Sequence, residues 1–291
     1  MKTKKPITDI IRKRHSCRTY STRPVEKDLK DQLEQLLADS PAGPFGSRSR
    51  FELITATDED RDVLKDLGTY GFIKDPAGFI LSAVKQSPRN LEDFGYAMER
   101  NILYATDLGL GTCWLGGSFT RSTFAEKISA KEDETLPAVA SVGHMAPKMR
   151  MVEKAIRWGA GAKNRKPWKD LFFKNGFNGS LSPEDIGIWA EPLEMVRIAP
   201  SASNRQPWRI VHESTTRRFH FYLQRSKGYQ TRNKILFGIA DLQRVDMGIA
   251  MCHFEMTGKD LGFFGKWSFD EPNIGKLPEL TSYVASWQTS Q

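Results

Sequence analysis

The sequence predicts an α+β protein whose strands are mainly antiparallel. Short apolar stretches rich in β-branched and aromatic residues alternate with amphipathic helical patterns. One long helical pattern also occurs twice, followed each time by a glycine and a strand-like stretch. The length of 291 residues allows either one large unit or two fused halves of similar size.

The two long helical patterns align without a gap. Residues 93–114 and 246–267 stand at a constant shift of 153 positions, and eight of the 22 pairs are identical. The identical pairs are Asp93/Asp246, Gly95/Gly248, Ala97/Ala250, Met98/Met251, Asp107/Asp260, Leu108/Leu261, Gly109/Gly262 and Trp114/Trp267. A repeat of this period predicts two fused subunits rather than a solenoid. The alternative is that two amphipathic helices share a pattern by coincidence.

The first half is predicted to run over residues 1–150. Its elements before the central helix are a short helix over 7–14, a helix opened by Pro24 and ending near Ala38, a strand over 51–56, a helix near 58–67 and an apolar strand over 78–84. After the central helix we expect a strand over 112–115, a helix near 121–129 and a strand over 138–142.

Residues 151–181 are predicted to connect the halves, because this part of the chain is rich in Gly, Lys, Asn and Pro. The second half is predicted over 182–291. Ser182-Pro-Glu-Asp starts a helix that is expected to reach about Arg197, since proline suits the first helical position and acids suit the first turn. Strands over 207–213 and 218–223, the second central helix and a strand over 263–269 complete the prediction.

Composition excludes several classes of protein. Apolar and charged fractions of 39% and 27% are those of a globular protein, and no stretch has the apolar length of a signal peptide or a membrane span. We therefore expect a cytoplasmic protein that does not bind a membrane. Three scattered cysteines and five histidines at no ligand spacing predict neither a disulfide framework nor a metal site.

The net charge of +8 is concentrated in two blocks. Residues 146–180 hold nine Lys or Arg against two acids, and residues 205–234 hold eight against one. An anionic cofactor, an anionic substrate, a solvated basic face or a nucleic acid would each explain such blocks. The basic residues follow no helix-turn-helix, zinc-finger or RNP pattern, so we expect no nucleic-acid partner.

Two motifs far apart in the chain point to one anion-binding site. Arg14-His-Ser-Cys-Arg-Thr-Tyr20 is a cationic cluster suited to an anion. Pro200-Ser-Ala-Ser-Asn-Arg-Gln-Pro-Trp-Arg-Ile-Val211 is a polar turn of small residues that leads into an apolar strand. GLGTCWLGGSF at 109–119 and GHMAPKMR at 143–150 stand between them.

These four motifs, in this order, resemble the FMN-dependent nitroreductase family, and in particular its single-chain branch of two fused halves. The resemblance covers nearly the whole chain. It implies a nitroreductase-like fold in which the two halves form an intramolecular pseudodimer, and hence a monomer. In the family two subunits together hold each FMN; here three motifs lie in the first half and one in the second, which implies one FMN per chain.

The resemblance also implies which residues bind FMN. Arg14, His15 and Ser16 would contact the phosphate and ribityl chain, Arg18 the N1 and O2 edge of the ring, and Lys148 and Arg150 the phosphate. The backbone of Leu115, Gly116 and Gly117 would pass along the ring near N5 and O4, where a side chain would obstruct close approach. The opposite half would supply Pro200, Ser201, Ala202, Ser203 and Asn204.

The second potential site of the pseudodimer is predicted to be lost. Its counterpart to the small-residue turn, residues 40–50, lacks the Asn-x-Gln-Pro-Trp pattern. Its counterpart to the double glycine is taken to be Phe264-Gly265-Lys266, where a bulky residue stands. Residues 162–168 correspond only loosely to the first cationic motif.

The expected activity is an FMN-dependent oxidoreductase that uses NAD(P)H to reduce a small flat acceptor such as a nitroaromatic or quinone. No residue is expected to act as a classical acid, base or nucleophile; Arg18 would stabilise the anion of the reduced flavin. Two other classes stay open. The protein binds FMN for storage or sensing without turnover, or it is a basic protein that interacts with nucleic acid.

Overall fold

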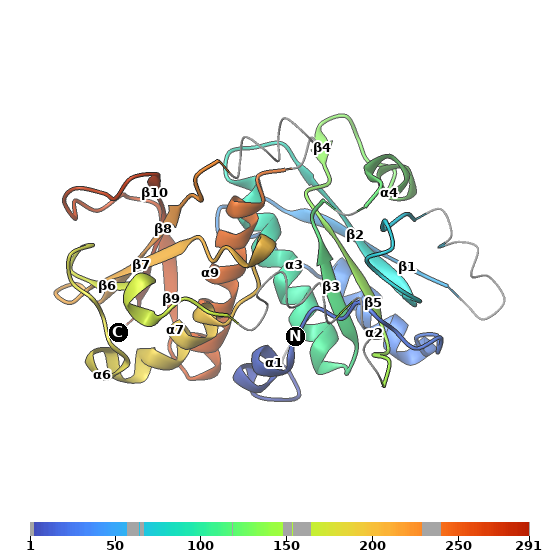
Figure 1. Ribbon diagram of the computed structural model, residues 1–291, viewed down its shortest axis with the longest axis horizontal. Helices are drawn as coiled ribbons and strands as arrows, with labels where there is room; N and C mark the ends of the chain where they lie inside the picture. The colour runs from blue at the N-terminus through green and yellow to red at the C-terminus, as the bar shows by residue number, and fades with distance from the viewer. Residues whose placement is uncertain are drawn as a thin grey trace.

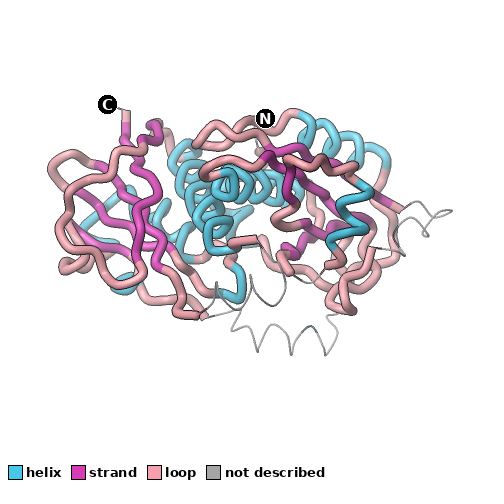
Figure 2. Tube along the Cα trace, turned by 90° about the horizontal axis from the view of Figure 1, so that it is seen from above, coloured by secondary structure: helices cyan, strands magenta, loops and turns pink. Residues whose placement is uncertain are grey.

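Two sheets flank a pair of long helices, α3 (Asn90–Asp107) and α9 (Leu242–Asp260) (Figure 1). The computed structural model describes residues 3–56, 64, 67–117, 119–147, 153, 164–228 and 240–290. Seen from above, the long helices lie between the strands of the two sheets (Figure 2). The layout agrees with the predicted α+β class.

The first sheet has the order β1-β2-β5-β3, with β4 paired to β2, and all its pairs are antiparallel. Its strands are β1 (Ser49–Thr55), β2 (Gly78–Lys85), β3 (Gly111–Leu115), β4 (Glu134–Thr135) and β5 (Val139–Gly143). The helices of this part are α1 (Ile7–Lys13), α2 (Lys27–Ala38) and α4 (Arg121–Lys127). β2 and β5 are buried along almost their whole length, as their continuous apolar sequences predict.

The second sheet has the order β6-β7-β8-β10-β9. β6 and β7 are parallel, and the other pairs are antiparallel. Its strands are β6 (Phe172–Lys174), β7 (Trp208–Glu213), β8 (Arg218–Gln224), β9 (Gly265–Ser268) and β10 (Thr281–Thr289). Helical segments around it are η2 (Trp168–Asp170), α6 (Pro183–Ile186), η3 (Gly187–Trp189), α7 (Ala190–Arg197) and η4 (Ala202–Asn204).

The helix predicted from Pro183 to Arg197 is interrupted. Its start is as predicted: Ser182 and Asp185 form a reciprocal capping box, and Pro183 occupies the first helical position. Gly187 then adopts a positive φ of 57°, which ends α6, and the chain passes through η3 into α7. A further difference is β10, which the sequence analysis did not predict. The predicted helix near 58–67 lies mostly outside the described residues.

The close contact of α3 and α9 depends on two glycines. A Cβ atom on Gly95 would lie 2.1 Å from the carbonyl oxygen of Val245, and one on Gly248 would lie 1.9 Å from that of Glu92. Real Cβ atoms do not approach a carbonyl oxygen so closely, so each glycine lets the backbone of the other helix come into contact. The two contacts are reciprocal. Gly248 lies 153 positions after Gly95, and Val245 lies 153 positions after Glu92.

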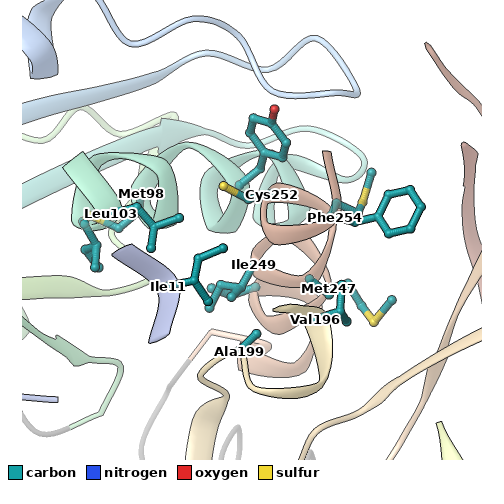
Figure 3. Close-up of a cluster of buried hydrophobic side chains, with 14 of the residues drawn as sticks. Ile11, Met98, Leu103, Val196, Ala199, Met247, Ile249, Cys252 and Phe254 are labelled. Atoms are coloured by element: carbon teal, nitrogen blue, oxygen red, sulfur yellow. The ribbon is translucent and has the colours of Figure 1, made fainter. Parts of the chain in front are cut away.

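The core extends from the helix pair into both sheets. α3 and α9 are buried along most of their length, and side chains from α1 and α7 pack against them. Figure 3 shows Ile11, Met98 and Val196 gathered around Ile249 and Met247 of α9. α3 and α9 end as the sequence predicts, at Gly109 and Gly262, which have φ values of 87° and 85°.

Neither a membrane-spanning helix nor a metal-binding cluster is present among the described residues. In this part of the chain, no helix is long and apolar enough to cross a membrane. No group of three or more His, Cys, Asp or Glu side chains lies together in a way that would hold a metal ion, again among the described residues.

We expect Gly248→Ala to lower the free energy of unfolding by about 1–3 kcal/mol, because the added methyl group forces the two helix backbones apart. Gly258→Ala is the matched control in the same helix. A Cβ there meets its nearest atom, the oxygen of Phe263, at 3.4 Å, so its helix propensity should leave stability unchanged or raise it. Urea unfolding of both variants measures the difference, and equal effects would contradict the assigned role of Gly248.

Candidate functional site

A cavity of about 350 Å³ lies where the end of β3 meets the start of α9. Five segments that are distant in the sequence line it. The lining residues are Ser16, Arg18, Trp114, Gly116, Gly117, Ala138, Pro200, Ser201, Ala202, Ser203, Leu242, Val245, Asp246 and Ile249. The structure therefore brings together residues from the cationic motif, the double glycine and the small-residue turn.

A broader groove of about 850 Å³ lies elsewhere, between α2, β1 and the start of α3. None of the predicted site residues lines it. Its Arg50 is already engaged by Glu134 at 2.8 Å and by the carbonyl oxygen of Ile128 at 2.8 Å. The smaller cavity is the better candidate site, because it is the one on which the separate motifs converge.

The cationic motif reaches the cavity because it runs along the edge of β3. The amide of Cys17 donates to the carbonyl oxygen of Thr112 at 2.8 Å, and Ser16 forms an isolated parallel bridge with Thr112. Successive side chains along an extended segment alternate between two sides. Cys17 is accordingly buried, at 3% exposure, whereas Ser16 and Arg18 line the cavity.

The double glycine lets β3 end against α9. A Cβ on Gly116 would lie 2.6 Å from Cδ1 of Leu242, so a glycine is needed for the end of β3 to contact the start of α9 this closely. Leu115 does not line the cavity; its side chain is 2% exposed and belongs to the core of the first sheet. Only a backbone contact by Leu115 remains compatible with its predicted role.

The small-residue turn is fixed by a carboxyl group from α9. The amide of Ala202 donates to Oδ1 of Asp246 at 2.9 Å, and the amide of Gln206 donates to Oγ of Ser201 at 2.9 Å. Ser203 and Asn204 have positive φ values of 50° and 53°, which keep this turn tight. The result is a rigid edge of small side chains on one side of the cavity.

Asn204 takes a different place from the one predicted. Its amide nitrogen donates to the carbonyl oxygen of Asn164 at 2.9 Å, and its Oδ1 accepts from Arg165 and Gln206, each at 3.2 Å. Asn204 is not among the residues that line the cavity. Arg165, from the predicted connecting segment, therefore lies against the small-residue turn.

Arg14 and His15 also lie outside the lining of the cavity. They border a separate small recess with Gly109, Thr112 and Met145. Nε of Arg14 lies 3.9 Å from Oε1 of Glu99. Burial, and then the charges of Arg14 and Arg197, lower the pKa of Arg165 to about 10. Lys148 and Arg150 lie outside the described residues.

The sequence analysis missed six residues of the cavity wall. Trp114 lies in β3, and Ala138 directly precedes β5. The other four, Leu242, Val245, Asp246 and Ile249, form one face of α9. The spacing of these α9 residues is helical and was visible in the sequence. It is the same spacing that a purely structural helix shows, so it gave no separate signal for a site.

Trp114 is held in place by a buried ion pair between α3 and α9. Its indole nitrogen donates to Oε2 of Glu99 at 2.7 Å, and Nε2 of His253 lies 2.9 Å from Oε1 of the same carboxylate. Burial raises the pKa of Glu99, but the hydrogen bond and charge of His253, then Arg14 and Trp114, outweigh it and hold the pKa below its usual value. Nδ1 of His253 faces the carbonyl oxygen of Met195 at 2.9 Å. Both ring nitrogens therefore face acceptors.

Comparison with known proteins identifies the family. The family model described as "Putative TM nitroreductase" matches residues 6–258, and the chain belongs to this nitroreductase family. A comparison with curated protein sequences gave no match.

Several solved structures that resemble the chain are described as nitroreductases. A putative nitroreductase from Thermotoga maritima is 17% identical, with a TM-score of 0.60 over 99% of this chain and 95% of that one. A nitroreductase family protein from Clostridium difficile is 21% identical, with a TM-score of 0.41 over 56% of this chain and 94% of that one. A putative nitroreductase in complex with FMN from Desulfovibrio desulfuricans is 22% identical, with a TM-score of 0.39 over 53% and 96%.

We expect Glu99→Gln to lower the free energy of unfolding by about 3–5 kcal/mol at neutral pH, because it leaves the buried His253 without its charge partner. The pKa of Glu99 is lowered in the folded protein, so its contribution is present above the pKa of an unfolded glutamate and is lost as the pH falls through the lowered value. The difference between the variant and the wild type should therefore shrink in acid.

The control is Glu191→Gln, which removes the pair between Arg12 and Glu191, whose side chains are 48% and 36% exposed. This change should cost no more than about 1 kcal/mol. Urea unfolding at several pH values measures both variants. A similar small cost for both would show that the pair of Glu99 and His253 does not join the helices.

Proposed function

We propose that this protein is a flavin oxidoreductase that binds one FMN in the cavity between its two halves and passes electrons from NAD(P)H to a small flat acceptor. A nitroaromatic or a quinone represents the acceptor class. One observation carries the proposal: a single cavity in a member of the nitroreductase family is lined by Arg18, Gly116 and Ser201, which come from three distant motifs.

The residues of the cavity suit a flat, partly anionic ring system. Gly116 and Gly117 leave a side of the wall free of side chains, and the residues from Pro200 to Ser203 are all small. Leu242, Val245 and Ile249 offer an apolar surface to the ring. Bound FMN would supply hydride transfer at N5. Arg18 would stabilise the negative charge that reduction leaves near N1 and C2=O.

The phosphate would lie on the side of the cavity toward Arg14. By the resemblance, Arg14, His15 and Ser16 bind the phosphate and the ribityl chain, with Lys148 and Arg150 as further phosphate contacts. The charge of Arg14 acts on Arg165, which supports a cationic environment there. Asn204 would act indirectly, by holding Arg165 and the small-residue turn.

We further propose that residues 1–150 and 182–291 are duplicated halves joined by 151–181, and that they form a pseudodimer within a monomer. Three features support the duplication. Gly95 and Gly248 make reciprocal contacts, Gly109 and Gly262 end their helices in the same conformation, and Asp93 and Asp246 each hold a loop of their own half. In each case the two residues stand 153 positions apart.

We infer that the second potential site is filled by side chains, on the evidence of the described residues. The residue 153 positions after Gly116 is Phe269. Phe269 directly follows β9, as Gly116 directly follows β3. We therefore take Phe269, and not Phe264, as the counterpart of Gly116. Phe269 stacks on Phe45 with ring centroids 4.3 Å apart, and the guanidinium of Arg89 lies 5.0 Å from the centre of the Phe45 ring. These side chains occupy the place that corresponds to the open cavity, which supports one FMN per chain.

We expect purified protein to be yellow, to contain one FMN per chain and to be bleached by NADH or NADPH without oxygen.

Ala202→Phe should abolish FMN binding. It adds an aromatic ring to the cavity at the loop position that corresponds to Phe45, whose ring fills the other potential site. Ala42→Phe adds the same ring at an exposed position and should leave binding intact. Absorbance spectra and titration with FMN measure the result. A yellow protein that neither nicotinamide bleaches would instead indicate storage or sensing, and a colourless protein that does not bind FMN would overturn the proposal.

Arg18→Ala should weaken FMN binding about ten- to hundredfold, since it removes a hydrogen bond from a charged group. It should also lower the reduction potential of the bound flavin, because the anion of the reduced form loses its nearest cation. Arg12→Ala, which removes an exposed arginine from α1, is the control and should change neither quantity. Unchanged potential in Arg18→Ala would contradict the role of Arg18.

A further inference from the structure

Asp246 is a buried carboxyl group in the wall of the cavity, and one of its oxygens has no hydrogen-bond partner. The residue is 2% exposed. Oδ1 accepts the amide hydrogen of Ala202 at 2.9 Å, whereas Oδ2 is buried without a partner among the described residues. An ionised carboxylate in such a place would be poorly solvated, which favours the neutral acid.

Asp93 is the matching residue for comparison, because it also binds a loop through backbone amides. It stands 153 positions before Asp246 and is likewise buried, at 0% exposure. Its Oδ1 accepts from the amide of Phe45 at 2.7 Å, and its Oδ2 accepts from the amide of Ser47 at 2.6 Å. Both oxygens of Asp93 are thus used by its loop, whereas Asp246 holds its loop with one oxygen and keeps the other.

The charges around Asp246 do not favour its ionised form. Asp241, at the start of α9, is paired with Arg225, and Glu92 of α3 is paired with Arg244. Arg18 lies in the wall of the same cavity, but no ion pair between it and Asp246 is present among the described residues. Burial, and then the charge of Asp241, raise the pKa of Asp246 well above its usual value. Because Oδ1 accepts the amide hydrogen, the acidic hydrogen belongs on Oδ2.

We propose that Asp246 is the proton donor to the electron acceptor in this cavity. The inference rests on the proposed function. A quinone becomes a hydroquinone by taking up one hydride and one proton. The O–H bond of Asp246 breaks and a quinone O–H bond forms. The hydride comes from the cofactor, which NAD(P)H has reduced beforehand. The electron pair of the broken O–H bond stays on the carboxylate, which then takes a proton from water. Asp246 therefore acts as a general acid.

Asp246→Asn separates proton transfer from binding. The amide oxygen can still accept from Ala202, and the amide nitrogen can still donate where the acid donated, but it cannot release a proton. Bleaching by NADH takes no proton from the protein, so the quantity that tests the role of Asp246 is the rate of reoxidation by quinone relative to the rate of bleaching. Reoxidation by a quinone should slow about a hundredfold or more, which is the usual contribution of a general acid.

Ferricyanide provides the internal control, because it takes electrons without taking a proton. Reoxidation of Asp246→Asn by ferricyanide should equal that of wild type. Asp93→Asn is the matched variant outside the cavity. It can accept only one of the two loop amide hydrogens, so its stability should fall, but its ratio of quinone to ferricyanide rates should stay that of wild type. Equal slowing by quinone and ferricyanide, or no slowing with quinone, would overturn the role of Asp246.

A second measurement does not depend on activity. The infrared spectrum of wild-type protein at neutral pH should contain the carbonyl band of a neutral carboxylic acid, and Asp246→Asn should lack it. Absence of this band from the wild type would also overturn the inference. A protein that binds no FMN contradicts the proposed function itself. A yellow protein that NADH bleaches, and whose Asp246→Asn variant is reoxidised by quinone at the wild-type rate, contradicts only this inference.

Discussion

The close crossing of α3 and α9 is the constraint on which the rest of the structure depends. Gly95 and Gly248 let each helix touch the backbone of the other, and no larger residue fits at either position without moving a carbonyl group. This contact places the start of α9 beside the end of β3. Since α9 also holds the turn from Pro200 to Ser203, the crossing determines how far that turn lies from Arg18 and Gly116.

Buried polar groups then give the crossing a single arrangement. Glu99 of α3 meets His253 of α9, and both side chains are 0% exposed. Such a pair is costly unless its hydrogen bonds are complete, and here the same carboxylate also binds Trp114, while His253 contacts the carbonyl of Met195. A sliding of one helix along the other would break all of these contacts together. The position of Trp114 in the cavity wall is thus coupled to the register of the two helices.

Much of the fold was predictable because its signals are local. The helical spacing around Met98 and Met251, the glycines at the helix ends and the capping box at Ser182 all act within a few residues, and each is found in the structure. Gly187, by contrast, was passed over inside an apparent helix, although its positive φ separates α6 from α7. β10 was missed although Tyr283, Ala285 and Trp287 belong to a stretch rich in strand-forming residues.

The sequence predicted only those site residues whose type is unusual for a core or a surface. Cationic, small and glycine residues stood out in the sequence, whereas Leu242 and Val245 looked like any helix face directed at a core. The role of Asn204 depends on Asn164 and Arg165, which are distant in sequence, so its hydrogen bonds could not be read from the motif alone.

The difference between the two halves follows from the same geometry. A loop held by an aspartate from a central helix lies beside the end of a strand in each half. In one half the loop and the strand end carry Ala202 and Gly116, so a space remains; in the other they carry Phe45 and Phe269, which fill it by stacking. The filled half buries aromatic surface between the halves, which stabilises their association. Beside the space that remains, Asp246 keeps an oxygen that its loop does not use, whereas both oxygens of Asp93 are used.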